Sequence, residues 1–300
     1  MLKIAFDPIY HHPLPPGHRF PMEKYSLLPQ QLLHEGTCTK ENFFRPDPLT
    51  EKEVLRIHTM DYWTKLKELN LSRQEERRTG FPLSEMLVQR ELTIVGGTVQ
   101  NVNFALENGV SMNIAGGTHH AYRDRGEGFC LLNDIALGAS HLLFNKKADR
   151  ILVIDLDVHQ GNGTASIFQD EPRVFTFSMH GGNNYPLHKE RSDLDVPLPD
   201  GIEDQEYLDL LSENLEKATR IQRPDFVFFQ SGVDIIKGDK LGRLGVSIEG
   251  SRERDRMVLQ WCHQNSVPVA ISMGGGYSPH IKDIIEAHAN TFRMAQDVYF

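Results

Sequence analysis

The chain has 300 residues, of which 39% are hydrophobic and 24% are charged, and its formal net charge at pH 7 is −9. This composition is ordinary for a globular protein with a sizeable core, and the negative charge argues against nucleic acid as a direct ligand. The three cysteines lack CxxC spacing, which argues against a disulfide framework and against a cysteine zinc site.

In chain order, the sequence alternates between short apolar runs and longer helical patterns. The first run, residues 2–6, is typical of a strand and not of a signal peptide. No apolar run approaches the ~18 residues that a membrane-spanning helix needs. We therefore expect a cytoplasmic protein without a membrane partner. The predicted strands cover residues 2–6, 111–115, 150–156, 173–179, 225–230 and 267–273.

The predicted helices lie between these strands. They cover residues 84–109, 133–145 and 204–221. The charged stretch 72–82 is predicted to be a mobile surface loop. Strands that alternate with helices predict an α/β fold, in which a parallel sheet carries helices on both faces. Because no linker divides the chain, we expect a single domain over residues 1–300.

The segment IDLDVHQGNG, residues 154–163, places three polar side chains at the end of a predicted buried strand. Residues at i, i+2 and i+4 of an extended segment point to one side, so Asp155, Asp157 and His159 converge there. Burying two carboxylates and an imidazole is costly unless something neutralises the charge, and a divalent cation would do so. The alternative is a strand-end aspartate that caps a helix, beside a surface histidine. The full DxDxHxGxG string favours the metal.

Asp234, in the stretch QSGVD (230–234), also lies just beyond a predicted buried strand. Alone, such an aspartate is typical of a turn or a helix cap. Ligands of open parallel sheets bind beyond the carboxyl ends of the strands, so Asp234 can join Asp157 and His159 there. Three protein ligands, with open positions left for water and substrate, are what a catalytic zinc site requires.

Two further strand ends carry candidate catalytic groups. His119 and His120 follow a Gly-Gly turn. Beside a metal, a neutral imidazole can act as general base and general acid, although tandem histidines also occur in plain polar loops. In MGGGY (273–277), the glycines allow a close backbone approach, and Tyr277 can donate to a developing oxyanion. A half-buried core tyrosine is the alternative for Tyr277.

Five segments, in this order, resemble the zinc-dependent histone deacetylase family, which includes bacterial acetoin-utilisation and acetylpolyamine amidohydrolase relatives. The short chain and the stretch DKLGRLGVS are similar to the compact bacterial and class IV-like members. The resemblance implies the arginase–deacetylase fold, with an eight-stranded parallel sheet flanked by helices. The segments are GGTHHAYRDRGEGFCLLNDIA (116–136), IDLDVHQGNGT (154–164), TFSMH (176–180), FQSGVDIIKGDKLGRLGVS (229–247) and MGGGY (273–277).

The resemblance also implies two metal sites. Zinc would be bound by Asp157, His159 and Asp234. Because two carboxylates and one imidazole are relatively hard ligands, Fe²⁺, Co²⁺ and Mn²⁺ are substitutes to consider. The second site would hold a structural potassium ion near Asp155, Asp157, His159, Ser178 and Met179.

Roles in catalysis and substrate binding follow from the same resemblance. It implies that His120 is the proton-transfer residue, that Asp155 is the acid partner of His119, and that Tyr277 is the transition-state tyrosine. The residues implied to contact substrate, several of them in a narrow channel for the acyl chain, are Gly128, Phe129, Tyr185, Gly275 and Leu241.

Asn162 is a departure from class I relatives, which carry an aspartate as the partner of the second histidine. An amide can orient His120 but cannot stabilise an imidazolium by charge. We therefore expect His120 to lose its proton more easily than in class I enzymes, with activity retained.

The function predicted from these residues is that of a zinc-dependent amidohydrolase, which removes an acyl group, expected to be acetyl, from a lysine or another amine by means of metal-activated water. The expected partner is an acylated lysine in a protein or peptide, or a small acylated amine. An acetylpolyamine deacetylase, a small-molecule deacetylase, a longer-chain deacylase, an arginase-like ureohydrolase and an inactive metal-binding scaffold are the alternatives. The sequence leaves the physiological substrate, the acyl-chain length and the oligomeric state open.

The remaining histidines carry weaker signals. His11, His12 and His18 lie in a proline-rich segment that we expect at the rim of the site. His180 follows a predicted strand without a role that the residues suggest, and Cys130 is expected to pack rather than to act as a nucleophile. The histidines expected to be ordinary core or surface residues are His58, His188, His263 and His288.

Overall fold

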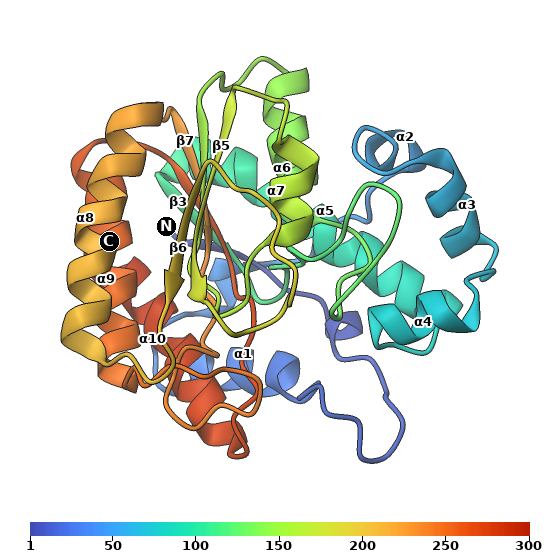
Figure 1. The fold of residues 1–300 in the computed structure, drawn as a ribbon, viewed down its shortest axis with the longest axis horizontal. Coiled ribbons are helices and arrows are strands. Elements are labelled where there is room, and N and C mark those ends of the chain that lie inside the picture. Colours follow the sequence, from blue (N-terminus) through green and yellow to red (C-terminus); the bar gives the residue numbers. More distant parts are fainter.

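Eight parallel strands form one sheet through the centre of the molecule (Figure 1). The computed structural model describes residues 1–300. The strand order across the sheet is β2-β1-β3-β8-β7-β4-β5-β6. The strands are β1 (Lys3–Ala5), β2 (Phe43–Phe44), β3 (Val110–Asn113), β4 (Ile151–Asp155), β5 (Val174–Gly181), β6 (Leu194–Leu198), β7 (Phe226–Gln230) and β8 (Val269–Ser272).

The middle strands are apolar nearly throughout because both faces of the sheet are covered. Every residue of β3, β8, β7 and β4 is buried, as expected for a parallel sheet between two helical layers. The six strands predicted from apolar runs are all present, and the eight-stranded parallel sheet that the family resemblance implied is confirmed. The apolar runs did not reveal the two edge strands, β2 and β6. β2 has only two residues and β6 is largely half-exposed, so neither has the continuous apolar run of a central strand.

Helices cover both faces of the sheet. In Figure 1, α8, α9 and α10 lie on one side of the strands and α5, α6 and α7 lie on the other, and α1 packs against α10. Ser84 caps α5 by accepting a hydrogen bond from the backbone N–H of Leu87. The helices are α1 (Lys24–His34), α2 (Glu51–Val54), α3 (Met60–Lys67), α4 (Arg73–Thr79), α5 (Glu85–Asn108), α6 (Asp134–Phe144), α7 (Asn162–Phe168), α8 (Asp204–Gln222), α9 (Ile248–Gln264) and α10 (Ile281–Tyr299).

The stretch 72–82 is not a loop throughout, and that prediction was wrong. Most of it forms helix α4. Ser72 and Glu75 make a reciprocal capping box at its start, and Gly80 ends it in the left-handed conformation. Helical structure there rests on its caps, because the segment has no apolar stripe.

The carboxyl ends of β4 and β7 meet near the middle of the sheet. In the register of this strand pair, Asp155 lies opposite Gln230. The segments that leave these two strands therefore start side by side, and they carry Asp157 and Asp234. β8 pairs with β7 on the other side and leads into the Gly-rich stretch that ends at Tyr277.

No helix combines the length and the apolar character needed to cross a membrane.

Candidate active site and metal centre

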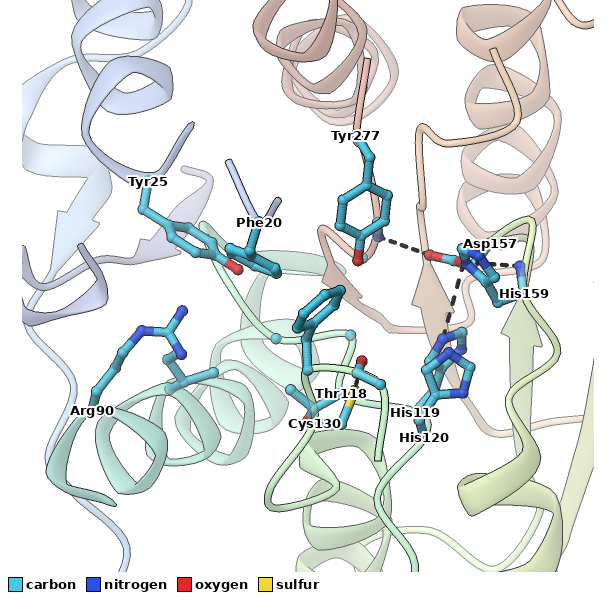
Figure 2. Close-up of a pocket in the computed structure, with 17 residues that line it drawn as sticks. Phe20, Tyr25, Arg90, Thr118, His119, His120, Cys130, Asp157, His159 and Tyr277 are labelled. Carbon is cyan, nitrogen blue, oxygen red and sulfur yellow. Dashed lines mark hydrogen bonds and ion pairs between the residues drawn. The ribbon is translucent and has the colours of Figure 1, made fainter. Parts of the chain in front are cut away.

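Asp157, His159 and Asp234 form one buried cluster beyond the ends of β4 and β7. One ligand atom from each residue lies within 4.8 Å of the others. His159 Nδ1 is 3.0 Å from Asp157 Oδ1 and 3.2 Å from Asp234 Oδ2. Figure 2 shows Asp157 and His159 beside Tyr277 and the tandem histidines. The structure thus brings together the three residues that the sequence analysis assigned to a metal.

Backbone groups hold the two carboxylates in place. The N–H of Gly275 donates to Asp157 Oδ2 at 2.7 Å, and the N–H of Val158 donates to Asp234 Oδ1 at 3.0 Å. A Cβ at Gly275 would lie 1.9 Å from Asp234 Oδ2 and 2.8 Å from Asp157 Oδ2. Only glycine allows this backbone to pass so close to both carboxylates.

The electrostatics of the cluster fit a bound cation. Burial, and then the charge of Asp157, raise the pKa of Asp234 to about 7. Burial alone would lower the pKa of His159, but its hydrogen bond to Asp157 and the negative charges of Asp234 and Asp157 outweigh burial and raise that pKa to about 10. Asp234 Oδ2 is buried and accepts no hydrogen bond of acceptable geometry. A divalent cation would satisfy this oxygen and offset the charge of two buried carboxylates.

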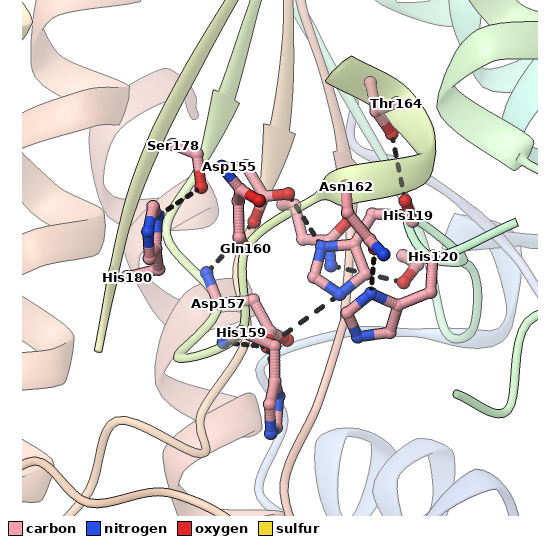
Figure 3. A network of polar contacts seen from close by, with 12 residues as sticks. His119, His120, Asp155, Asp157, His159, Gln160, Asn162, Thr164, Ser178 and His180 are labelled. Atoms are coloured by element: carbon pink, nitrogen blue, oxygen red, sulfur yellow. Dashed lines mark hydrogen bonds and ion pairs between the residues drawn. The ribbon is translucent and has the colours of Figure 1, made fainter. Parts of the chain in front are cut away.

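His119 is held by a carboxylate. Its Nδ1 lies 2.7 Å from Asp155 Oδ2 (Figure 3), and both side chains are buried. Burial disfavours the imidazolium, but the charge of Asp155 and its hydrogen bond outweigh burial and raise the pKa of His119. Asp155 therefore lies where the sequence analysis placed it, as the acid partner of His119.

His120 is held by an amide instead. Its Nδ1 lies 2.6 Å from Asn162 Oδ1, and Asn162 Nδ2 donates to the Tyr122 hydroxyl at 2.9 Å. That hydroxyl in turn donates to Glu190 Oε1 at 3.1 Å. Burial, and then the neighbouring His119 and His159, hold the pKa of His120 well below its usual value. A neutral imidazole with Nδ1 protonated leaves the lone pair on Nε2 available.

Tyr277 lies on the opposite wall from the tandem histidines (Figure 2). Its ring centroid is 6.3 Å from that of His159, and its backbone N–H donates to Asp239 Oδ2 at 2.6 Å. Burial, and then the charges of Asp234 and Asp157, raise the pKa of Tyr277 well above its usual value. The phenol therefore stays protonated and can donate a hydrogen bond.

Four residues predicted to contact substrate line the mouth of this site. Tyr185, Leu241, Gly128 and Phe129 line one cleft together with His120, His159 and Tyr277. Gly128 and Phe129 both have left-handed backbones, with φ of 52° and 68°. Gly275, the fifth, belongs to a small inner chamber of about 40 Å³.

The structure also shows residues that the sequence analysis did not select. Phe20, Tyr25 and Arg90 line the inner chamber beside Thr118 and Cys130 (Figure 2). Lys24 is buried and its Nζ donates to the Gly274 carbonyl at 3.1 Å, across 250 residues of sequence. No local pattern marks these residues, because tertiary contacts alone bring them to the site. Asp239 had one weak signal, its place in the DKLGRLGVS stretch.

Ser178 and Asp155, two of the residues near the expected potassium site, lie on neighbouring strands. Ser178 pairs with Asp155 in the register of β4 and β5. Its Oγ lies 3.0 Å from His180 Nδ1 (Figure 3), and burial lowers the pKa of His180 to about 4. His180 is the penultimate residue of β5 and does not follow the strand as predicted. The potassium ion itself stays a prediction.

The other histidines divide between rim, core and surface. His11, His12 and His18 line a cleft that also contains Tyr277. His58 and His288 are buried, whereas His188 and His263 are exposed. Cys130 is buried, and burial raises the pKa of its thiol well above the usual value, as expected for a packing residue.

Known proteins are similar to this chain in sequence and in fold. Residues 18–292 match the family model described as the histone deacetylase domain. An uncharacterized protein of Picosynechococcus sp. is 45% identical over 99% of both chains. Histone deacetylase 2 of Arabidopsis thaliana is 32% identical, over 87% of this chain and 70% of its own length.

Solved structures agree with the sequence matches. The crystal structure of an HDAC homolog complexed with SAHA superposes with a TM-score of 0.86 at 25% identity, over 99% of this chain and 84% of its own. The HDA15 HD domain, at 20% identity, shares the fold with a TM-score of 0.84, over 99% of this chain and 88% of its own. The family match over most of the chain, with this fold, shows that the chain belongs to the histone deacetylase family.

Proposed function

We propose that this deacetylase-family hydrolase is a zinc-dependent amidohydrolase, which removes an acyl group from a lysine side chain or another amine. The observation that carries the proposal is the buried Asp157–His159–Asp234 cluster, which lies beside two differently held histidines and a protonated tyrosine. A zinc ion bound by these three residues would polarise the acyl carbonyl and lower the pKa of a coordinated water.

The residues of the chain supply proton transfer and charge stabilisation. His120, held neutral by burial, takes a proton at Nε2 and later delivers it to the leaving amine. Asn162 fixes the ring through Nδ1. Tyr277 donates its hydroxyl proton to the negative charge that develops on the acyl oxygen.

His119 has a different part, because Asp155 raises its pKa. Burial first, and then positive charge on His119 through repulsion, lower the pKa of the neighbouring His120. Asp155 and His119 therefore act as positioning and electrostatic residues, and His120 carries the proton transfer.

Two alternatives have less support. An arginase-like ureohydrolase needs a second metal, and the chain has no second cluster of three or more metal-ligating side chains. An inactive scaffold would not need a neutral His120 that can accept a proton and a protonated Tyr277 that can donate a hydrogen bond, both beside the same cluster. Acetyl-lysine proteins, acetylpolyamines and substrates with longer acyl chains would all be hydrolysed by this chemistry. The residues at the mouth of the site would select among these substrates.

The test combines metal content with hydrolysis of an acyl-lysine reporter. We expect the purified protein to bind one zinc per chain and to hydrolyse the reporter, with chelator-sensitive activity. Asp234→Asn is expected to lose both zinc and activity. The matched control is Asp209→Asn, because Asp209 is an exposed aspartate on α8. Asp255 would not serve as a control, because it pairs with the buried Arg254. Zinc binding without hydrolysis of any acyl-amine would reject the proposal.

A further inference from the structure

Four basic side chains surround the entrance to the candidate site on a protein whose net charge is −9. Arg19, Arg77 and Arg78 line the entrance cleft together with His120, His159 and Tyr277. Lys240 lines the adjoining cleft, which also reaches Tyr277. All four are exposed.

None of the four has an ion-pair partner. No carboxylate oxygen lies within 4.0 Å of their charged groups, although the molecule has many other surface ion pairs. Glu127, next to the channel residue Gly128, is already engaged, because it pairs with Arg125 and accepts a hydrogen bond from the Tyr185 hydroxyl at 2.5 Å. Glu23 lines the adjoining cleft but makes no ion pair with any of the four cations. The entrance therefore carries uncompensated positive charge.

The backbone holds these cations at the entrance. Gly128 N–H donates to the Arg78 carbonyl at 3.0 Å, and Phe129 N–H donates to the Thr79 carbonyl at 2.7 Å. These bonds tie the last turn of α4 to the channel wall. The Arg19 guanidinium lies 5.0 Å from the centre of the Phe129 ring, so it too sits over that wall.

We infer that the preferred substrate is an acylated amine whose portion outside the channel is anionic, with carboxylate or phosphate oxygens near the acylated nitrogen. This rests on the proposed function and narrows its substrate class. Arginine guanidinium groups match such oxyanions in a planar, two-bond geometry. Several uncompensated cations also raise the local concentration of an anionic substrate, in a way that salt weakens.

The experiment compares acyl-lysine peptides that differ only in flanking charge. Three peptides carry glutamate, serine or lysine at the positions next to the acyl-lysine, and kcat/KM is measured at low and high salt. A second arm compares Nα-blocked acyl-lysine bearing a free carboxylate with its carboxamide, which separates a small acid from an acidic peptide as the source of the charge. We expect the acidic peptide to exceed the basic one by at least about tenfold at low salt.

Substitution of the arginines tests their part in this preference. The triple variant Arg19→Gln, Arg77→Gln, Arg78→Gln should lose most of the preference, with the acidic peptide losing more than the serine peptide. Arg220→Gln is the matched control, because Arg220 is an exposed arginine on α8 that lines neither cleft. It should keep the full preference.

Failure of this inference is distinguishable from failure of the proposed function. Hydrolysis of the serine peptide tests the proposed function alone. Binding of the three labelled peptides, followed by fluorescence anisotropy, tests the charge preference without turnover. Equal binding of acidic and basic peptides, a preference for the basic one, or an unchanged preference in the triple variant would each overturn the inference.

Discussion

Asn162 Oδ1 lies 2.6 Å from His120 Nδ1, and this amide is itself oriented from behind, because its Nδ2 donates to the Tyr122 hydroxyl. Its oxygen must therefore face His120. His119 has a carboxylate, Asp155, in the corresponding place at 2.7 Å. The two adjacent histidines thus have partners of different charge, and their pKa values shift in opposite directions.

Asn162→Asp should reverse part of this difference. A carboxylate beside Nδ1 favours the imidazolium, so the pKa of His120 should rise by at least about one unit. A general base must be deprotonated, so the acid limb of the kcat/KM profile against pH should move to higher pH. NMR titration of the metal-loaded protein reports the same pKa directly. An unchanged pKa in the variant would show that Asn162 does not set the basicity of His120.

Tyr277→Phe should separate catalysis from metal binding. The tyrosine hydroxyl makes no hydrogen bond within the protein, and the loop is held by its backbone N–H on Asp239. Removing the hydroxyl should therefore leave the fold and the zinc content intact. Turnover should fall by ~10²–10³, the usual cost of losing one oxyanion donor. Near-normal turnover with full zinc occupancy would remove Tyr277 from the reaction.

Gly275→Ala tests the close approach of the backbone to the metal ligands. The added Cβ would meet Asp234 Oδ2 at 1.9 Å, which forces the carboxylate or the backbone to move. We expect a large loss of zinc affinity, measured as metal retained against a competing chelator. Gly182→Ala is the control, because its Cβ would come no closer than 3.3 Å to another atom. Equal zinc affinity in the two variants would contradict this account.

The parts of the structure that the sequence predicted are those with a local signal. The central strands are apolar runs buried on both sides, and Asp155, Asp157 and Asp234 stand out because polar groups are unexpected at such strand ends. Helix α4 had a readable signal, the Ser72–Glu75 capping box, but its charged composition favoured a loop.

Long-range contacts have no comparable signal. Lys24 reaches Gly274, and Asp239 holds Tyr277, only because the chain folds back on itself. The cationic entrance depends in the same way on where α4 docks against Gly128 and Phe129. Residues of this kind support the site from segments that lie far from any motif, so one sequence cannot reveal them.

His58 should make the stability of the fold dependent on pH. Its Nε2 accepts a hydrogen bond from the backbone N–H of Asn133, the N-cap of α6, at 3.1 Å. Burial lowers the pKa of His58 to about 4, against about 6.5 in an unfolded chain. Between these values the unfolded chain binds a proton that the folded chain does not. The stability that the neutral, buried His58 gives the fold is therefore fully present above pH 6.5. The free energy of unfolding falls as the pH drops from 6.5 toward 4.

Urea unfolding at pH 7.5 and pH 4.5 measures this loss. Relative to wild type, His58→Gln should lose roughly 2 to 3 kcal/mol less stability over this range, because glutamine cannot take up the proton. His188→Gln, which replaces an exposed histidine, is the matched control and should follow the wild-type pH dependence. If His58→Gln also follows the wild-type curve, the acid sensitivity of the fold must come from other groups.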